Sequence, residues 1–212
     1  ELPEFSRTTL EILRQPMEEG KIHLSRLGYS FEYPAKMMVV GAMNPCRCGF
    51  YPDMQKCRCT PMQVQNYLSR LSEPLLDRMD LCVEMEKAAF GLPETKKTAE
   101  NSEQIRSRVL AARERQERRY REESILYNSE LDGKTMEKYC SLPKNEKLLW
   151  RELCEQLELS ARGAKRLLRV ARTLADLSER EQIREEDLFE ASLYKGISRK
   201  YWNSIPEGMD RG

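Results

Sequence analysis

Four of the seven cysteines in this 212-residue chain lie within fourteen positions, a spacing that suits metal binding. They form two C-x-C pairs separated by eight residues, and these pairs are Cys46 with Cys48 and Cys57 with Cys59. An extended C-x-C directs both sulfurs to the same side, and Zn²⁺ accepts four thiolates in a tetrahedron. The pattern therefore predicts a closed, structural zinc site, and the alternative is four free thiols on a loop.

Two polar side chains stand where the chain is expected to pass from one element to the next. Asn44 follows the apolar run 37–43, and an Asn at the carboxyl end of a strand can orient a water or a phosphate oxygen. Taken in isolation, the residue is more typical of a local Asx turn before Pro45. Arg78 lies between an expected helix and an expected strand, where a salt bridge to a neighbouring aspartate is the commoner role.

One face of the expected helix 160–178 is basic, while another carries an apolar stripe. The basic face contains Arg162, Arg166, Arg169 and Thr173. Such a face is either solvated or in contact with phosphate. The sequence DGKT at 132–135 only imitates the end of a phosphate-binding loop, because no apolar strand and no correctly spaced glycine precede it.

Composition excludes several classes of protein. With a single histidine, the chain cannot build a His-based triad or a multi-histidine metal site. No apolar run approaches the roughly 18 residues that a membrane span needs. The net charge is only +1, so any nucleic-acid contact has to come from a local patch. An odd, clustered set of thiols favours the reducing cytoplasm over a secreted disulfide framework.

Hydrophobic periodicity predicts an α/β region over 1–86, a linker over 87–100 and an all-α region over 101–212. In the first region we expect a helix over 5–20 and a β-hairpin over 21–34 turning near Leu27-Gly28. We also expect buried, parallel strands over 37–44 and 79–85, and a helix over 61–77 with a break near Pro74. In the second we expect helices at about 102–121, 134–141, 143–158, 160–178 and 184–194.

The order of several segments resembles the magnesium-chelatase-like AAA+ ATPases of the ComM/YifB family over about residues 1–195. The segments that carry the resemblance are "ELPEFSRTTLEILRQ", "AMNPCRCG", "CRCTPMQVQNYLSRLSEPLLDRMDL" and "LSARGAKRLLRVARTLADL". The resemblance implies the C-terminal part of an AAA+ core with a pre-sensor 1 hairpin, followed by a helical lid. It also implies ATP and Mg²⁺ as cofactors of the complete protein.

The resemblance further implies roles for individual residues. Glu1 looks like the Walker B glutamate that polarises the attacking water, and Asn44 looks like sensor 1. Arg78 matches the arginine finger that one subunit extends to its neighbour, a contact that contributes about 10³ to 10⁵ in rate. Arg162 matches the sensor 2 arginine of the lid, and Arg70 is a second trans-acting candidate.

The expected hairpin would point into the pore of a hexameric ring, where His23, Arg26, Leu27 and Tyr29 would contact DNA. This implies ATP hydrolysis coupled to DNA remodelling or branch migration, as in a competence helicase. The alternatives are a chelatase-type subunit that acts through a protein partner, and a zinc-stapled protein-binding module. The sequence contains no GxxxxGK[ST], so we expect this chain alone neither to bind ATP tightly nor to hydrolyse it.

Overall fold

The structure is a computed structural model that describes residues 1–85 and 100–202. The chain divides into two compact units. The first comprises residues 1–79 and the chain from Ile197, and the second comprises residues 80–196. The predicted linker, 87–100, lies outside the described residues except for its last position. None of the described helices is long and apolar enough to cross a bilayer.

The first unit begins with three short helical segments in place of the single helix expected over 5–20. They are η1 (Leu2–Glu4), α1 (Arg7–Ile12) and α2 (Arg14–Glu19). Pro16 explains the interruption, because a proline lacks an N–H and its ring clashes with the carbonyl four residues earlier, that of Ile12. The Ser6 side chain caps α1, and Gly20 ends α2 in the left-handed conformation with φ of 65°.

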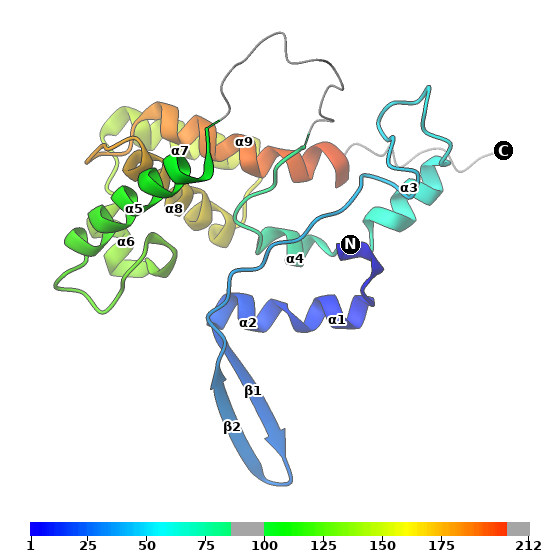
Figure 1. Ribbon diagram of the computed structural model, residues 1–212, viewed down its shortest axis with the longest axis horizontal. Helices are drawn as coiled ribbons and strands as arrows, with labels where there is room; N and C mark the ends of the chain where they lie inside the picture. Colours follow the sequence, from blue (N-terminus) through cyan, green and yellow to red (C-terminus); the bar gives the residue numbers. More distant parts are fainter. Residues whose placement is uncertain (86–99, 203–212) are drawn as a thin grey trace. The chain divides into compact units, whose positions relative to one another are not determined.

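A two-stranded antiparallel hairpin follows α2, as the alternating pattern predicts. Strands β1 (Lys21–Arg26) and β2 (Tyr29–Pro34) pair from Lys21↔Pro34 to Arg26↔Tyr29. Leu27 and Gly28 form the turn, and both have positive φ, at 49° and 81°. Two such residues match the right-handed twist of the strands, which places the turn where the sequence indicates. Figure 1 shows the hairpin extending from the end of α2.

The two expected parallel strands do not form, and this prediction is wrong for the described structure. Residues 37–44 and 79–85 have no regular structure, and the hairpin is the only sheet in the described residues. A strand requires a hydrogen-bonded neighbour, and no described segment supplies one. Their apolar side chains are therefore largely exposed, as at Met38 (88%), Val40 (83%) and Met85 (85%).

Helices α3 (Pro61–Leu68) and α4 (Glu73–Asp77) replace the helix expected over 61–77. Thr60 and Gln63 form a capping box at the start of α3, where Pro61 occupies the first turn. Two small hydrophobic clusters result. One contains Cys46, Val64, Tyr67, Leu68 and Tyr201, and the other contains Leu10, Leu71 and Leu75.

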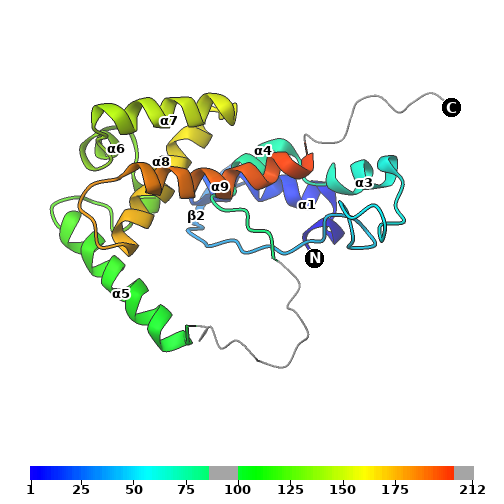
Figure 2. The same cartoon turned by 90° about the horizontal axis from the view of Figure 1, so that it is seen from above.

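The second unit is helical, as its sequence pattern predicts. Its elements are α5 (Ser102–Arg119), η2 (Asn128–Glu130), α6 (Gly133–Tyr139), α7 (Lys144–Gln156), α8 (Ala161–Leu177) and the first part of α9 (Glu185–Trp202). Helices α5 to α8 gather into one bundle in both views (Figures 1 and 2). One contiguous core lies between them, and its fully buried members include Leu131, Leu167, Ala171, Ala175 and Leu188.

A buried ionic network ties the second unit together. Asp176, which is 1% exposed, pairs with Arg119 and Arg172. Its carboxylate also accepts a hydrogen bond of 2.8 Å from the Asn128 amide. Asn128 opens the segment that imitates a phosphate loop, so this segment serves as a turn before α6.

Helix α9 continues beyond the end expected near residue 194. Gly196 costs about 1 kcal/mol in a helix interior. The last turns of α9 nevertheless form, because Tyr201 and Trp202 pack on the hydrophobic clusters of the first unit. The Trp202 indole N–H also donates to the Leu68 carbonyl at 3.0 Å.

Candidate functional site

The four clustered cysteines come together as a set of metal ligands. The Sγ–Sγ distances are 3.3 Å for Cys46–Cys48, 3.5 Å for Cys48–Cys57 and 3.8 Å for Cys46–Cys57. All four sulfurs, including that of Cys59, lie within 4.8 Å of one another. Sulfurs around a tetrahedral zinc stand about 3.8 Å apart, since each Zn–S bond is about 2.3 Å. The donor set and its spacing therefore fit a zinc ion with a closed coordination sphere.

Local backbone structure brings the two C-x-C pairs together. Gly49, with φ of 79°, turns the chain directly after the first pair, and its N–H donates to the Cys46 carbonyl at 3.0 Å. Backbone N–H groups of Phe50 and Arg58 both point at the Cys48 sulfur. Only glycine adopts this conformation without a steric cost, so the turn depends on it.

The thiols ionise unequally, as expected for four sulfurs at this distance. Hydrogen bonds from the backbone of Phe50 and Arg58 lower the pKa of Cys48 to about 6. At Cys57 a backbone N–H favours the thiolate, but burial and the neighbouring Cys48 and Cys46 outweigh it and raise the pKa to about 12. Without a cation the first thiolate therefore suppresses ionisation of the next, and a divalent ion relieves that repulsion.

The cysteine loop is anchored on α3. Cys46 is fully buried against Val64, Tyr67 and Leu68. Burying this thiol among apolar side chains fixes the start of the loop to one face of the helix. A metal ion at the cluster would thus connect the loop to the core of the first unit.

Glu1 and Asn44 lie on segments of the first unit that a backbone hydrogen bond joins, and their catalytic roles stay predictions. The Leu2 N–H donates to the Ala42 carbonyl at 2.9 Å, which aligns the first residues with the segment that ends at Asn44. Both side chains are exposed. An acidic and an amide side chain that share one edge can orient the same water molecule.

Tyr67 links these two residues, and sequence reasoning missed it. Burial raises the pKa of Tyr67, and the charges of Glu1 and Glu4 raise it further, whereas the backbone N–H of Asn44 opposes the shift. Tyr67 is 4% exposed and lies on α3, two turns after the capping box. Its position among the polar residues of α3 was the available signal, but only the folded chain shows what its hydroxyl contacts.

The two trans-acting candidates both make internal contacts in the first unit. Arg70 donates to the Pro3 carbonyl at 2.7 Å. Arg78 is 9% exposed, forms an ion pair with Glu18 on α2 and donates to the Pro74 carbonyl at 2.7 Å. A buried guanidinium needs such partners. A trans-acting role for Arg78 stays a prediction, and it requires the guanidinium to leave Glu18.

The predicted basic stripe on α8 is used mostly for internal contacts. Arg166 is buried and pairs with Asp80 at 2.7 Å, and Arg169 donates to the Leu131 carbonyl at 2.8 Å. Arg162 alone among these arginines is exposed, in the first turn of the helix. It belongs to the second unit, and its sensor 2 role stays a prediction.

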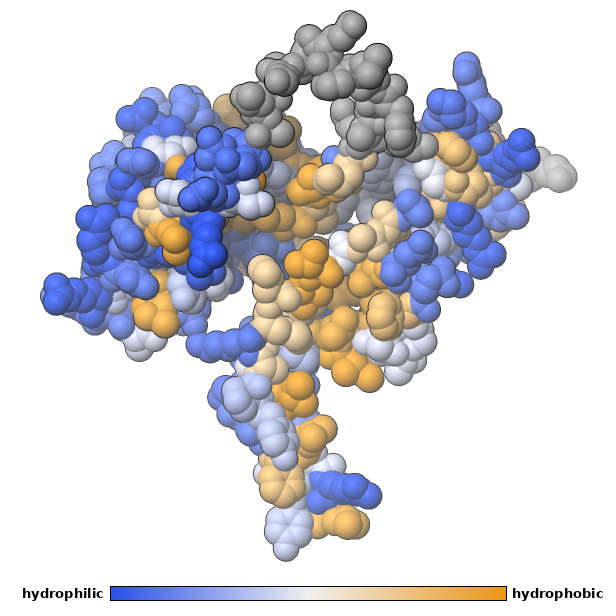
Figure 3. Space-filling model, in the orientation of Figure 1, coloured by the Kyte–Doolittle hydropathy of each residue, from blue (hydrophilic) through white to orange (hydrophobic). Residues whose placement is uncertain are grey.

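The hairpin has two chemically different faces. On one face Arg26 and the aromatic side chains of Tyr29, Phe31 and Tyr33 follow one another, and the rings of Tyr29 and Phe31 stack at 6.3 Å with an interplanar angle of 23°. All are exposed, and Figure 3 shows apolar side chains along the hairpin. Alternation in the sequence indicated this face, although Phe31 and Tyr33 were not among the predicted contacts.

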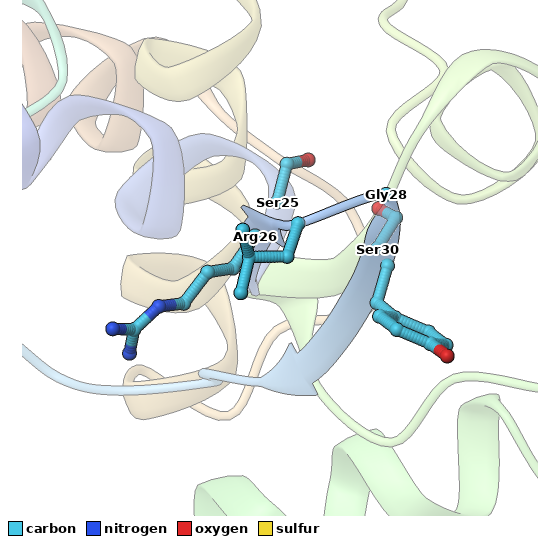
Figure 4. Close-up of a pocket in the computed structure, with 6 residues that line it drawn as sticks. Ser25, Arg26, Gly28 and Ser30 are labelled. Atoms are coloured by element: carbon cyan, nitrogen blue, oxygen red, sulfur yellow. The ribbon is translucent and has the colours of Figure 1, made fainter.

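His23 lies on the opposite face of the hairpin and faces two carboxylates. Its ring nitrogens are 3.3 Å from Glu19 and 3.7 Å from Glu32. Both carboxylates carry the same sign of charge as a phosphate, and the DNA contact predicted for His23 stays a prediction. At the tip a shallow pocket of about 340 Å³ contains Arg26, whose side chain extends away from Gly28 and Ser30 (Figure 4).

Comparison with known proteins identifies relatives for most of the chain. The family model described as magnesium chelatase, subunit ChlI, matches residues 1–91, and the one described as magnesium chelatase, subunit ChlI C-terminal, matches residues 99–195. The protein YifB of Escherichia coli is 43% identical over 201 residues, which cover 94% of this chain and 38% of that protein.

Two other relatives show the same coverage. YifB of Salmonella typhimurium is 42% identical over 200 residues, and the competence protein ComM of Haemophilus influenzae is 39% identical over 200 residues. Each alignment covers 94% of this chain and 38% of the relative, so the chain spans well under half the length of the curated relatives it matches. Two family models that together match most of the sequence, and relatives near 40% identity, agree with each other, and the chain belongs to the magnesium-chelatase-like family of ComM/YifB-type proteins.

Proposed function

We propose that this chain is the C-terminal part of a ring-forming AAA+ ATPase that couples ATP hydrolysis to DNA remodelling. The observation that carries the proposal is that Glu1 and Asn44 both lie near Tyr67, beside the hydrogen bond from the Leu2 N–H to the Ala42 carbonyl. Family membership supports an ATPase, and the relative named as a competence protein supports a role with DNA.

In this proposal Glu1 polarises the attacking water, and the Asn44 amide holds the same water in place. Arg162 on α8 would act as the lid arginine, and Arg78 or Arg70 would reach the nucleotide of a neighbouring subunit. ATP with Mg²⁺ would supply the phosphoryl group when bound. Because this sequence has no GxxxxGK[ST], we expect hydrolysis only in a longer protein that contains this chain.

The hairpin supplies the proposed DNA contact. Its exposed aromatic face suits base stacking, which contributes about 1 to 3 kcal/mol per base and tolerates any sequence. Arg26, beside Tyr29 at the turn, would pair with a phosphate. Phe31 and Tyr33 replace His23 in this assignment, because His23 faces Glu19 and Glu32.

A structural zinc ion at the cysteine cluster is part of the same proposal. The four sulfurs within 4.8 Å of one another support it. With four protein ligands the site leaves no open position for substrate, so its role is to hold the loop on α3. A hexameric ring and a cytoplasmic location remain predictions from the family resemblance.

The decisive experiment uses the longer protein and a branched DNA substrate. We expect ATP-dependent branch migration that Tyr29→Ala combined with Phe31→Ala reduces by more than about tenfold, since two stacking contacts are lost. His23→Ala, on the opposite face, is the matched control and should leave the rate nearly unchanged. ATP hydrolysis without any strand displacement would instead favour a chelatase-type subunit that acts on a protein partner.

The ATPase half of the proposal has its own test. Asn44→Ala in the longer protein should retain ATP binding and lose most turnover, because the water is no longer positioned. A turnover within about twofold of the unmodified protein would remove Asn44 from the site.

A further inference from the structure

A polar concavity lies beside α3 and the cysteine loop, and of its lining residues the function proposed above uses only Arg70. It has a volume of about 190 Å³ and is lined by Arg47, Gln63, Asn66, Tyr67 and Arg70. We propose that this concavity binds a phosphate group, of a nucleic-acid backbone or of a nucleotide, through Arg47 and Arg70. The site shares no residue with the hairpin, so it adds a second phosphate contact to the protein.

Three of the lining residues belong to α3, and a fourth follows it. Gln63 and Tyr67 are four positions apart on one face of the helix, and Arg70 lies in the turn directly after its end. Asn66 neighbours them on the same side. Arg47 comes from the cysteine loop, between Cys46 and Cys48, and buried Cys46 fixes that loop to the helix. The loop therefore holds a second guanidinium over the polar face of α3.

The lining offers donors to an anion. It contains two guanidinium groups, two side-chain amides and a phenol, and none of the lining residues carries a carboxylate. Guanidinium is the group that matches phosphate geometry best, because its planar fork forms two parallel charge-assisted hydrogen bonds. About 190 Å³ exceeds the roughly 30 Å³ of one water several times, so a phosphate has room.

The two arginines differ in the hydrogen bonds that their guanidinium groups already make. Arg70 donates one N–H to the Pro3 carbonyl at 2.7 Å. This hydrogen bond orients the side chain and leaves most of its five donors available. Arg47 is exposed, and within residues 1–85 and 100–202 no hydrogen bond or ion pair involves its guanidinium. A fixed arginine and an unengaged one together form an anion site that needs little rearrangement.

Tyr67 connects the concavity to the proposed water-orienting residues. Its hydroxyl faces the backbone N–H of Asn44, and burial together with Glu1 and Glu4 raises its pKa, so it remains a donor at neutral pH. The same two carboxylates oppose an anion nearby. Phosphate binding therefore requires both arginines, and replacing either one should lower the affinity.

The test uses the 212-residue chain, reduced and supplied with zinc, and two probes. The probes are inorganic tripolyphosphate and a 20-nucleotide oligothymidylate, titrated calorimetrically at low salt. Arg47→Ala should weaken both complexes about tenfold, the effect of losing one charge-assisted hydrogen bond. Arg58→Ala is the matched control, because Arg58 occupies the same place between Cys57 and Cys59 but does not line the concavity.

Arg70 requires a second variant, because its bond to Pro3 also supports the fold. Arg70→Lys keeps the charge and loses the fork, and we expect it to weaken binding at an unchanged melting temperature. A nucleic-acid source is indicated if Arg47→Ala lowers the salt dependence of oligothymidylate binding by about one unit of slope. A nucleotide source is indicated if tripolyphosphate binds more tightly than the oligonucleotide and displaces it.

The proposal is overturned if neither probe binds, or if Arg58→Ala weakens binding as much as Arg47→Ala does. The second result would mean that any loop cation attracts the probe without a defined site. Neither result contradicts the proposed motor function, which is measured separately by branch migration and by hairpin variants in the longer protein.

Discussion

The two units solve the problem of burying apolar side chains in different ways. The unit of residues 80–196 closes one contiguous core between its helices and adds the buried Asp176 network. The unit that begins at residue 1 has two small clusters, while apolar residues such as Met38 and Val40 remain exposed. Helices satisfy their own backbone hydrogen bonds, so a helical unit needs only side-chain packing. A strand also needs a neighbour for its backbone.

The first unit compensates with specific polar and sulfur contacts. Cys46 is buried at the cysteine cluster, and Arg78 is buried with Glu18 as its partner. These contacts are a single ion pair and a set of thiols that could hold a metal ion. The comparison therefore predicts that loss of a metal ion or of an ion-pair partner destabilises the first unit more. Loss of side-chain packing should destabilise the second unit more.

Zinc removal should produce the largest difference between the units. Structural zinc ions bind zinc-finger peptides with an apparent free energy of about 10 to 16 kcal/mol, and this binding is coupled to folding. Cys57→Ser or a strong chelator should remove about one zinc per chain and lower hydrogen-exchange protection over residues 41–68. Elemental analysis and exchange mass spectrometry measure both effects.

The control for this prediction is Cys154→Ser, because Cys154 is a half-buried thiol of the second unit far outside the cluster in sequence. It should retain zinc. A reduced, purified chain that holds no metal even after zinc is added would contradict the prediction, and so would equal loss of protection in both units.

Asp176→Ala should destabilise the second unit more than the first. It leaves the guanidinium groups of Arg119 and Arg172 buried without their carboxylate, which costs about 3 to 5 kcal/mol. Denaturant unfolding followed by hydrogen exchange should show the loss in residues 100–196. Glu181→Ala, at an exposed carboxylate, should change the free energy of unfolding by less than about 0.5 kcal/mol. A small effect of Asp176→Ala would show that the network is dispensable.

Core truncation tests how separately the two units unfold. Leu10 and Leu167 are both fully buried, at 1% and 0% exposure, one in each unit. Replacing either by Ala should cost about 2 to 5 kcal/mol. Each loss should appear in the exchange of its own unit. Ile12→Ala, on the same helix as Leu10 but 67% exposed, is the control. If Leu10→Ala weakened residues 100–196 equally, the two units would unfold as one.

The smallest predicted effect concerns acid pH. A hydrogen bond from Ser72 and then the contact with Arg14 lower the pKa of Glu11 in the first unit, and contacts with Lys138 and then Tyr139 lower the pKa of Glu123 in the second. A lowered folded pKa stabilises the protein above the ordinary value of 4.5, and this contribution is lost as the pH falls through the folded value.

Glu11→Gln and Glu123→Gln should therefore each flatten the acid limb of a plot of melting temperature against pH. The change should be small, because both carboxylates are accessible to solvent. Above about pH 6 the melting temperature should depend on pH as it does in the unmodified protein, because both carboxylates are then ionised. An unchanged acid limb in both variants would show that these bonds do not persist in solution.

Local features of the sequence predicted local structure well. Gly28 at the turn and the alternation on either side determined the hairpin, since a two-residue turn with positive φ fits the strand twist. The cysteine spacing predicted the cluster, because C-x-C pairs and Gly49 act within a few residues of each other. Helix boundaries were less accurate, as Pro16 and the packing of Tyr201 show.

Long-range contacts were the part that could not be predicted. Nothing near Arg78 in the sequence indicates Glu18, sixty positions earlier, and nothing near Tyr67 indicates Asn44. Two apolar runs with strand-like composition lacked a partner among the described residues and did not form strands. Their composition favours a strand, but a ladder depends on another segment.

The sequence by itself determined the family, the helical second unit, the hairpin and the set of four thiols, because each follows from residue types and short spacings. Only the tertiary structure decided which cations are internal, and that Arg47 and Arg70 line one concavity together with Tyr67. These outcomes depend on contacts between distant segments, whose free energies are set by burial and by the partner that each charge finds in the folded chain.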